Sequence, residues 1–423
     1  MWLGGYFVIS WIDARNLAHR LGATARTSLP QRKLTKPSRD LPGTHSDGQA
    51  RPTTFPPLAP DGMPIVPVFD PRLESLRGLA ALVVCVQHAM SVFADDAPSV
   101  VKDALLAAFN SAAAVIFFFV LSGYVLGRAL ERDGALASYL GRRLFRLVPP
   151  FVAAVLFAFA CERLLRIDPI PPGLTQGFER IFWPQPTWDA LRDNLLLGSF
   201  AVIGPTWTLF PELLGSLMLP FVVAAHGSIS PRWGWALFFA IATLLAISPF
   251  HTLLWFYFGC FLAKEVTALL AGRWWLAVMS FVAGLVGLEM APHYGDFYSV
   301  RIVIPSAIAA ALMIGAVVSS RELLQWTTIM PLRFLGRISY SLYLVHWPIF
   351  YVCALLAVTC RSIVPTQTWG NLVVTVTSVS VALGIAALSY RFVEVPSIRA
   401  GKLVAPILAR MWTRIWRLQA ATG

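Results

Sequence analysis

Two titratable side chains interrupt the apolar stretch 72–90 at a spacing that suits a chemical site. Arg77 and His88 lie eleven residues apart. In an α-helix that spacing is about three turns and ~16 Å, so both side chains project from one face. In a membrane helix, Arg77 would lie near the surface and His88 about half-way through the ~30 Å hydrocarbon core. A histidine at that depth is costly unless it faces the protein interior or a wet cavity.

A neutral imidazole at the position of His88 has a recognisable chemistry. It can take the proton from an attacking hydroxyl and later protonate the leaving group. It can also attack an acyl group itself and form a covalent acyl-histidine intermediate. The sequence leaves both routes open, and a purely structural hydrogen bond to a neighbouring helix is the third interpretation of this residue.

Composition places the chain among polytopic membrane proteins. Of its 423 residues, 57% are hydrophobic and 13% charged, with a mean hydropathy of +0.65, whereas about a quarter of the residues of a soluble domain are charged. The net charge of +12 is concentrated in short loops and both tails, as membrane topology requires, and so predicts no nucleic-acid partner. The five cysteines form no CxxC pair, and we expect no metal site.

The apolar runs predict an all-α fold with ten transmembrane helices. Most of the 34 Lys and Arg residues fall on the side that also holds both termini, which predicts that both termini are cytoplasmic. An additional short or re-entrant segment at 191–203 is an alternative. The ten predicted spans are 73–94, 104–127, 147–165, 207–226, 233–249, 251–267, 273–290, 300–318, 333–357 and 369–392.

Three regions follow from these spans. Residues 1–68 precede the membrane domain and are predicted to be cytoplasmic and disordered, because they are rich in Arg, Pro, Ser and Thr. Met63, just before the first span, is a possible true translation start. Residues 69–398 form the membrane domain. Residues 399–423 are predicted to form a basic amphipathic helix on the anionic cytoplasmic leaflet, with calmodulin-like binding as the weaker alternative.

Four further polar islands interrupt the apolar runs. Ser122 lies within FFFVLSGYV at the end of the second span, and Arg143 and Arg146 lie within RRLFRLVPP before the third. Glu212 lies within WTLFPEL near the predicted outer end of the fourth span. His346 lies within GRISYSLYLVHWP in the ninth span, at a predicted depth similar to that of His88.

Together these motifs resemble the acyltransferase 3 family of integral membrane O-acyltransferases. Five motifs follow one another in the family's order over residues 70–398: an arginine and a histidine separated by ten residues in the first span, then FFxLSG, R-x-x-R, W-[ST]-L-x-x-E and SYSLYLxHxP. The late E-x-P motif lies at Glu394 and Pro396. The resemblance implies transfer of an acyl group, usually acetyl, from cytoplasmic acyl-CoA to a hydroxyl, often on an envelope glycan. A bacterial inner membrane is then the expected location.

The resemblance also implies roles for these residues. His88 would be the catalytic base. Ser122 would belong to the site that binds the acyl-CoA donor, where it could donate to the oxyanion, or together with Gly123 it could allow close helix packing. Arginines at the cytoplasmic mouth would grip the phosphates of acyl-CoA, because guanidinium groups bind phosphate oxygens bidentately and stay charged. The positive-inside rule alone also supplies arginines there. These arginines are Arg77, Arg143 and Arg146.

Three acidic or titratable residues have weaker implied roles. Glu212 could orient the acceptor hydroxyls, as a catalytic residue, or pair with an arginine. The sequence departs from the family pattern just after it, where Leu213 and Leu214 replace the usual aromatic pair, and this departure concerns the acceptor side. His346 is predicted to be either an interior hydrogen-bonded histidine or a functional one. Glu394 is predicted to be a structural ion-pair partner.

The sequence therefore predicts a ten-helix membrane O-acyltransferase. Its partners would be an acyl-CoA donor, a glycan or lipid-linked glycan acceptor, and membrane lipids; its oligomeric state is not predicted. A proton-coupled transporter of a polar or lipid-linked solute is the alternative, because buried His and Glu residues also mark such carriers. No internal hydropathy repeat is obvious, which weighs against most transporter folds.

Overall fold

The structure, a computed structural model, describes residues 70–93, 108–132, 136–165, 176–182, 186–290, 299–359 and 367–422. The chain divides into two units at residue 65, and all of the described elements belong to the second unit. The predictions made for residues 1–68, including disorder and a start at Met63, therefore fall outside the described residues.

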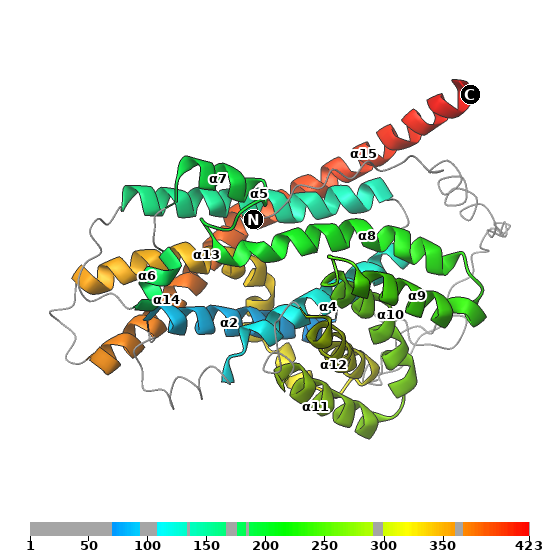
Figure 1. Ribbon diagram of the computed structural model, residues 1–423, viewed down its shortest axis with the longest axis horizontal. Coiled ribbons are helices and arrows are strands. Elements are labelled where there is room, and N and C mark those ends of the chain that lie inside the picture. The colour runs from blue at the N-terminus through cyan, green and yellow to red at the C-terminus, as the bar shows by residue number, and fades with distance from the viewer. Residues whose placement is uncertain are drawn as a thin grey trace, which may run out of the picture. The chain divides into compact units, whose positions relative to one another are not determined.

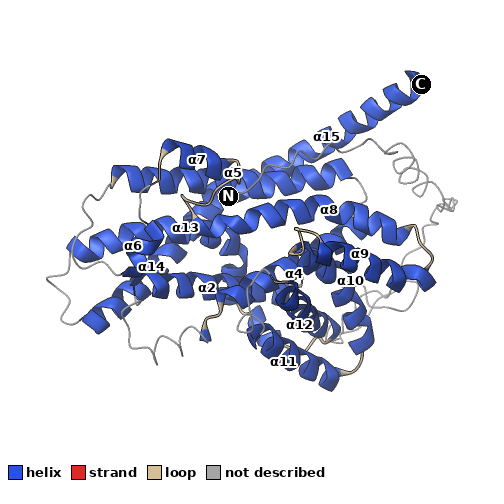
Figure 2. Cartoon of the chain, viewed as in Figure 1, coloured by secondary structure: helices blue, strands red, loops and turns tan. Residues whose placement is uncertain are grey.

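The regular elements in these ranges are all helical (Figures 1 and 2). Most are α-helices, joined by three short 3₁₀ turns and one π turn. In chain order they are α2 (Pro71–Phe93), α4 (Ser111–Arg132), α5 (Leu136–Leu164), α6 (Gln176–Phe182), α7 (Trp188–Leu195), η2 (Gly204–Thr208), α8 (Leu209–Gly227), η3 (Pro231–Trp233), α9 (Gly234–Ile247), α10 (Leu253–Leu270), α11 (Trp274–Met290), α12 (Val300–Ser319), η5 (Gln325–Thr328), α13 (Met330–Thr359), α14 (Gln367–Ser389), η7 (Tyr390–Glu394) and α15 (Val395–Thr422).

Each predicted span coincides with one of these helices. Within the described ranges, eight helical stretches are long and apolar enough to cross a membrane, while Pro231–Ile247 and Trp274–Met290 are shorter apolar helices. The all-α, polytopic membrane class is confirmed; the count of ten spans and the cytoplasmic location of both termini stay predictions. The segment 191–203 contains only the end of the short helix α7, followed by turns and bends.

Helix α5 begins eleven residues before the predicted edge at residue 147, because hydropathy marks the apolar part of a helix and not its polar start. Two prolines, Pro149 and Pro150, lie inside this helix. Pro149 has no N–H for the carbonyl of Phe145 one turn earlier. The hydroxyl of Ser397 at the start of α15 donates to that carbonyl, so a neighbouring helix satisfies the group that the proline leaves unpaired.

Helices α2 and α13 form the most extensive helix pair of the structure. A Cβ on Gly78 would lie 2.4 Å from the backbone nitrogen of Gly336, and a Cβ on Gly336 would lie 2.3 Å from the carbonyl oxygen of Glu74. Only glycine fits at both positions, so the two backbones touch there. Residues near the start of α2 contact residues near the start of α13, and residues further along α2 contact residues further along α13. The two helices therefore run parallel.

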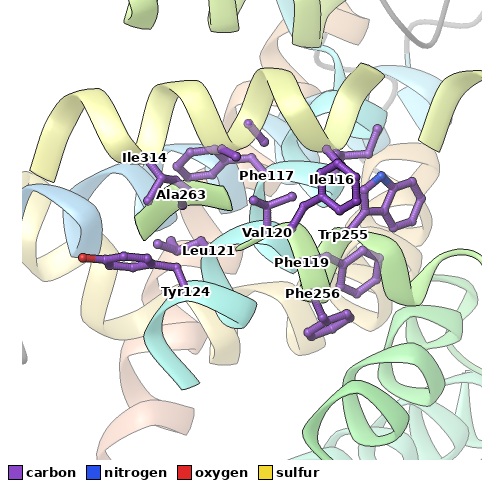
Figure 3. Close-up of a cluster of buried hydrophobic side chains, with 14 of the residues drawn as sticks. Ile116, Phe117, Phe119, Val120, Leu121, Tyr124, Trp255, Phe256, Ala263 and Ile314 are labelled. Atoms are coloured by element: carbon purple, nitrogen blue, oxygen red, sulfur yellow. The ribbon is translucent and has the colours of Figure 1, made fainter. Parts of the chain in front are cut away.

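A second close crossing joins α4 to α10, and α12 covers the pair (Figure 3). The ring of Phe119 stacks on that of Trp255, with centroids 5.4 Å apart. A Cβ on Gly123 would lie 2.0 Å from the carbonyl oxygen of Phe256. The close-packing interpretation of Gly123 is therefore confirmed by the geometry.

Replacing Gly123 by alanine should destabilise the protein strongly. The added methyl group meets backbone and not a flexible side chain, so the helices must separate, at a cost of about 1–3 kcal/mol or more. Thermal unfolding in detergent measures the effect. Gly384→Ala in α14 is the matched control, because nothing lies within 4 Å of its Cβ position. Equal melting temperatures for the two variants would contradict the close crossing.

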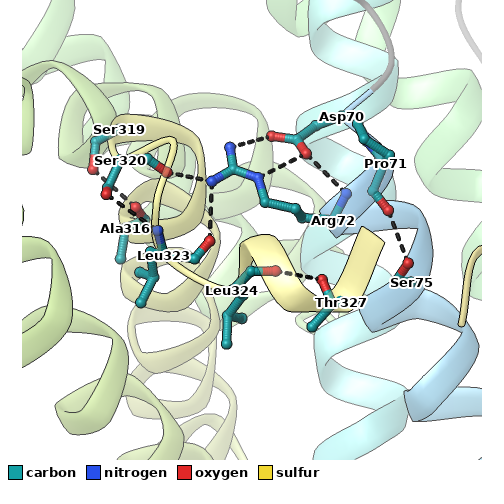
Figure 4. A network of polar contacts seen from close by, with 10 residues as sticks. All are labelled: Asp70, Pro71, Arg72, Ser75, Ala316, Ser319, Ser320, Leu323, Leu324 and Thr327. Atoms are coloured by element: carbon teal, nitrogen blue, oxygen red, sulfur yellow. Dashed lines mark hydrogen bonds and ion pairs between the residues drawn. The ribbon is translucent and has the colours of Figure 1, made fainter. Parts of the chain in front are cut away.

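A buried arginine fixes the entry of α2 (Figure 4). Arg72 pairs with the carboxylate of Asp70 at 2.7 Å. Its guanidinium also donates to the carbonyl of Ser320 and, at 3.0 Å, to that of Leu323. Because these carbonyls follow α12, the start of α2 is tied to the α12–α13 connection.

Helix α15 continues α14 through the π turn η7 and runs beside α5 (Figure 1). The hydroxyl of Ser138 donates to the carbonyl of Ala405 at 3.3 Å. The helix extends to Thr422, and the side chains of Leu403 and Ile407, on either side of this contact, are exposed. The tail 399–423 is thus helical up to Thr422, while its position on a lipid leaflet stays a prediction.

Candidate functional site

Two adjoining cavities lie among α2, α4, α5 and the helices around them. Their volumes are about 280 and 110 Å³, and they share five lining residues. These shared residues are Arg77, Phe118, Ser122, Arg143 and Arg146. All four residues predicted to bind the donor therefore line both cavities, although they come from three different helices.

The larger cavity is strongly basic. Besides the three predicted arginines, its lining includes Arg128, Arg132 and Arg142, against the carboxylates of Asp70 and Glu74. These additional arginines were not predicted to be site residues, because the positive-inside rule accounted for them. A signal was available, since Arg128 and Arg132 are four residues apart and so share one face at the end of α4.

Arg77 is held in place by α13. Its Nε donates to the hydroxyl of Ser339 at 3.0 Å, and its Nη2 donates to the carbonyl of Gly336 at 2.9 Å. A guanidinium has five N–H donors, so these two bonds leave donors for a ligand. Arg77 therefore fastens α2 to α13 and also presents positive charge to both cavities.

Glu212 lies at the centre of a polar cluster on the smaller cavity. It forms an ion pair with Arg143 and accepts a hydrogen bond from the hydroxyl of Ser122 at 3.0 Å. Arg143 also donates to the hydroxyl of Ser216 at 3.0 Å. Of the two roles considered for Glu212, pairing with an arginine is the one observed. The hydroxyl proton of Ser122 is therefore used in the hydrogen bond to that carboxylate.

His88 and His346 lie side by side. The Nδ1 of His88 is 2.9 Å from the Nε2 of His346, and the ring planes differ by 15°. The Nδ1 of His346 lies 3.0 Å from the carbonyl oxygen of Leu342. The structure thus joins two histidines from different spans, at a depth that the sequence predicted to be similar for both.

Neither cavity is lined by His88. The link is aromatic: the ring of Phe118, which lines both cavities, lies 6.4 Å from that of Tyr343, and Tyr343 lies 6.0 Å from His346. The histidine pair therefore adjoins the smaller cavity through these two rings.

Glu394 lies in the π turn η7, which contacts α13. It is buried, and its carboxylate accepts a hydrogen bond from the hydroxyl of Ser341 at 2.7 Å. Arg146 and Arg77 lie near enough to act on this carboxylate electrostatically, and its role as a structural ion-pair partner stays a prediction. Within the described residues, no group of three or more His, Cys, Asp or Glu side chains could hold a metal ion.

Fold and site define a multi-pass helical membrane protein with an arginine-lined cavity beside a pair of histidines. The chain belongs to the acyltransferase 3 family, whose acyltransferase domain matches residues 70–391. The predicted family is confirmed, and membership implies acyltransferase activity. The chain is also 29% identical to "Protein 2 in picA locus" of Rhizobium radiobacter over 157 residues, which cover 34% of this chain and 76% of that protein. No solved structure matches the chain significantly.

Proposed function

We propose that the protein transfers an acyl group, in the simplest case acetyl, from cytoplasmic acyl-CoA to a hydroxyl of an envelope glycan or lipid-linked glycan. The proposal places it in a bacterial inner membrane, with ten spans and both termini inside. The observation that carries the donor assignment is the gathering of Arg77, Arg143 and Arg146 around two adjoining cavities.

The chemistry of the donor explains why such a cavity would be needed. Acyl-CoA carries a pyrophosphate and a further phosphate, which cannot enter an apolar bundle without cationic partners. Six guanidinium groups line the larger cavity. The smaller cavity is lined by four charged residues, against eight in the larger one, and is bounded by Phe118, Tyr340 and Tyr343, so it suits the thioester end. The donor would thus lie with its nucleotide in the larger cavity.

The transfer step needs a base and later an acid. In the proposed step, His88 takes the proton of the acceptor hydroxyl, and the oxygen forms an ester bond with the acyl carbon. The C–S bond breaks, the electron pair stays on sulfur, and His88 returns the proton to give the free thiol. The products are an O-acylated acceptor and CoA. The acyl-histidine route yields the same products through the same ring.

Purified protein with radiolabelled acetyl-CoA and a glycan fraction from the membrane tests this function. Label that moves into the glycan supports the transferase. Uptake of a solute into proteoliposomes, without any label transfer, would favour the proton-coupled carrier. The control reaction omits the protein, because thioesters acylate strong nucleophiles slowly without an enzyme.

Arg146 offers the cleanest test of the donor site, because it lines both cavities. Arg146→Met should raise the KM for acyl-CoA by about 10- to 100-fold, since a charge-assisted hydrogen bond contributes about 1.5–3 kcal/mol. The kcat should change little if the arginine binds ground state and transition state alike. Steady-state kinetics with labelled donor measures both constants.

Arg232→Met is the matched control for that measurement. Arg232 is exposed, lies in η3 on the predicted cytoplasmic side, and lines neither cavity. Its replacement should leave the KM unchanged. A KM that stays constant in Arg146→Met, or that rises equally in both variants, would remove Arg146 from the donor site.

A further inference from the structure

His346 has no surface through which it could touch a substrate. The side chain is fully buried, and its ring is walled by Tyr343, Trp347 and Phe350, with centroids 6.0, 6.2 and 5.4 Å away. Both ring nitrogens are engaged, one by the carbonyl of Leu342 and the other by His88. Any part that His346 plays in the reaction must therefore act through His88.

The hydrogen-bond partners fix which nitrogen of each ring carries the proton. A carbonyl oxygen only accepts, so the Nδ1 of His346 must be the N–H that donates to Leu342. In a neutral imidazole the other nitrogen, Nε2, is then an acceptor. The Nδ1 of His88 lies 2.9 Å from it and must donate. The remaining nitrogen of His88, Nε2, therefore holds a lone pair.

That nitrogen is also the one left without a protein partner. Within the described residues, no hydrogen bond reaches the Nε2 of His88, and the side chain is only half-buried. The indole of Trp347 stands edge-on to the His88 ring, with centroids 5.5 Å apart and planes at 82°. The hydrogen bond at Nδ1 and this aromatic wall together restrict rotation of the ring.

We infer that His346 is a positioning residue, which holds His88 in the Nδ1–H tautomer and leaves its Nε2 as the nitrogen that reacts. The inference rests on the proposed acyl transfer. It applies equally to the base route and to the acyl-histidine route, because both need a lone pair on an accessible nitrogen. When Nε2 takes a proton, the Nδ1–H bond to His346 stays in place and stabilises the imidazolium.

The backbone supports this arrangement. Each histidine lies ten residues after the glycine at which its helix touches the other, Gly78 for His88 and Gly336 for His346. On parallel helices, equal offsets carry both side chains about 15 Å along the axis, so they lie at the same level. The close glycine contact thus fixes how near the two helices lie and the level at which the two rings meet.

Two substitutions at His346 separate positioning from packing. His346→Gln keeps an oxygen that can accept from the Nδ1–H of His88, so kcat should fall by about tenfold or less. His346→Phe removes the acceptor but suits the aromatic surroundings, and kcat should fall by about 10²- to 10⁴-fold, the range of general acid–base catalysis. The KM for acyl-CoA should stay constant in both, because His346 lines neither cavity.

A purely structural role predicts a different pattern. Loss of packing would lower the amount of folded enzyme and leave kcat per folded molecule unchanged, so active protein is counted by donor binding. His226→Gln, at a histidine that contacts Tyr257 outside the site, is the matched control and should retain wild-type kcat. Equal kcat values for the Gln and Phe variants at position 346 would overturn the inference. His346→Met takes the place of the Phe variant if that variant does not fold.

Nitrogen NMR of the full-length protein with ¹⁵N-labelled histidine tests the tautomer independently of activity. The wild type should show His88 protonated at Nδ1 and unprotonated at Nε2, assigned by loss of the signals in His88→Ala. The Phe variant should lose this tautomer and the Gln variant should keep it. An Nε2–H tautomer in the wild type would reject the inference even if the protein transfers acyl groups. An Nδ1–H tautomer without any transfer would reject the proposed function alone.

Discussion

Alanine at position 88 should lower the kcat of acyl transfer by about 10²- to 10⁴-fold, the contribution typical of a positioned acid–base group. Without the ring, no described side chain offers an unpaired nitrogen at that place. The KM for acyl-CoA should change little, because His88 lines neither cavity. Label transfer from radiolabelled acetyl-CoA, measured at saturating donor, gives the effect.

Donor binding provides the control for this variant. Calorimetric titration with CoA should give the same affinity in wild type and His88→Ala, which shows that the cavities remain intact. Equal rates of label transfer in the two proteins would exclude His88 from the mechanism. A loss of donor affinity without a loss of kcat would instead place the residue in the donor site.

Replacing Arg143 should mainly lower the stability of the folded protein, and only secondarily its affinity for acyl-CoA. The residue was predicted to bind the donor, but the structure pairs it with Glu212, and both side chains are largely buried, 11% and 14% exposed. Arg143→Met leaves that carboxylate without its counter-charge, which typically destabilises a protein by about 3–5 kcal/mol. Thermal unfolding in detergent, with and without CoA, measures the loss and any recovery on binding.

The double variant Arg143→Met with Glu212→Gln tests the cause. Because it removes both charges, it should recover most of the stability that the single variant loses. The amide of Gln can still accept from the hydroxyl of Ser122. If the double variant is as unstable as the sum of the two single variants, the pair makes no coupled contribution. The prediction would then fail, although Arg143 could still bind the donor.

The membrane helices and the family could be predicted from the sequence because each rests on local information. Apolar runs marked all ten helix positions, and they failed mainly at polar helix ends, such as the start of α5 at Leu136. The four residues predicted to bind the donor stood out because charge and hydroxyl side chains are conspicuous in apolar surroundings. That Arg77, Ser122 and Arg146 line common cavities agrees with that prediction of position; their ligand stays a proposal.

What the sequence could not supply is the pairing between helices. The sequence around Glu212 does not indicate that Arg143 of α5 pairs with Glu212. The relative register of two helices that are distant in sequence depends on packing over their whole length. The same holds for His346, whose partner was not predicted although both histidines were noticed. The rings of Phe118 and Tyr343 between the cavity and the histidine pair are ordinary apolar-helix residues by sequence.

The equal distances from Gly78 to His88 and from Gly336 to His346 constrain how this part of the chain can change. A deletion or insertion of one residue in either interval would turn the following histidine by about 100° and shift it by ~1.5 Å, which takes the two rings out of phase. The same length change in both intervals would keep the two histidines at one level, but it would turn them toward opposite sides of the helix pair, because both helices rotate in the same sense. Both lengths are therefore constrained one by one, because a change in one interval is not offset by the same change in the other.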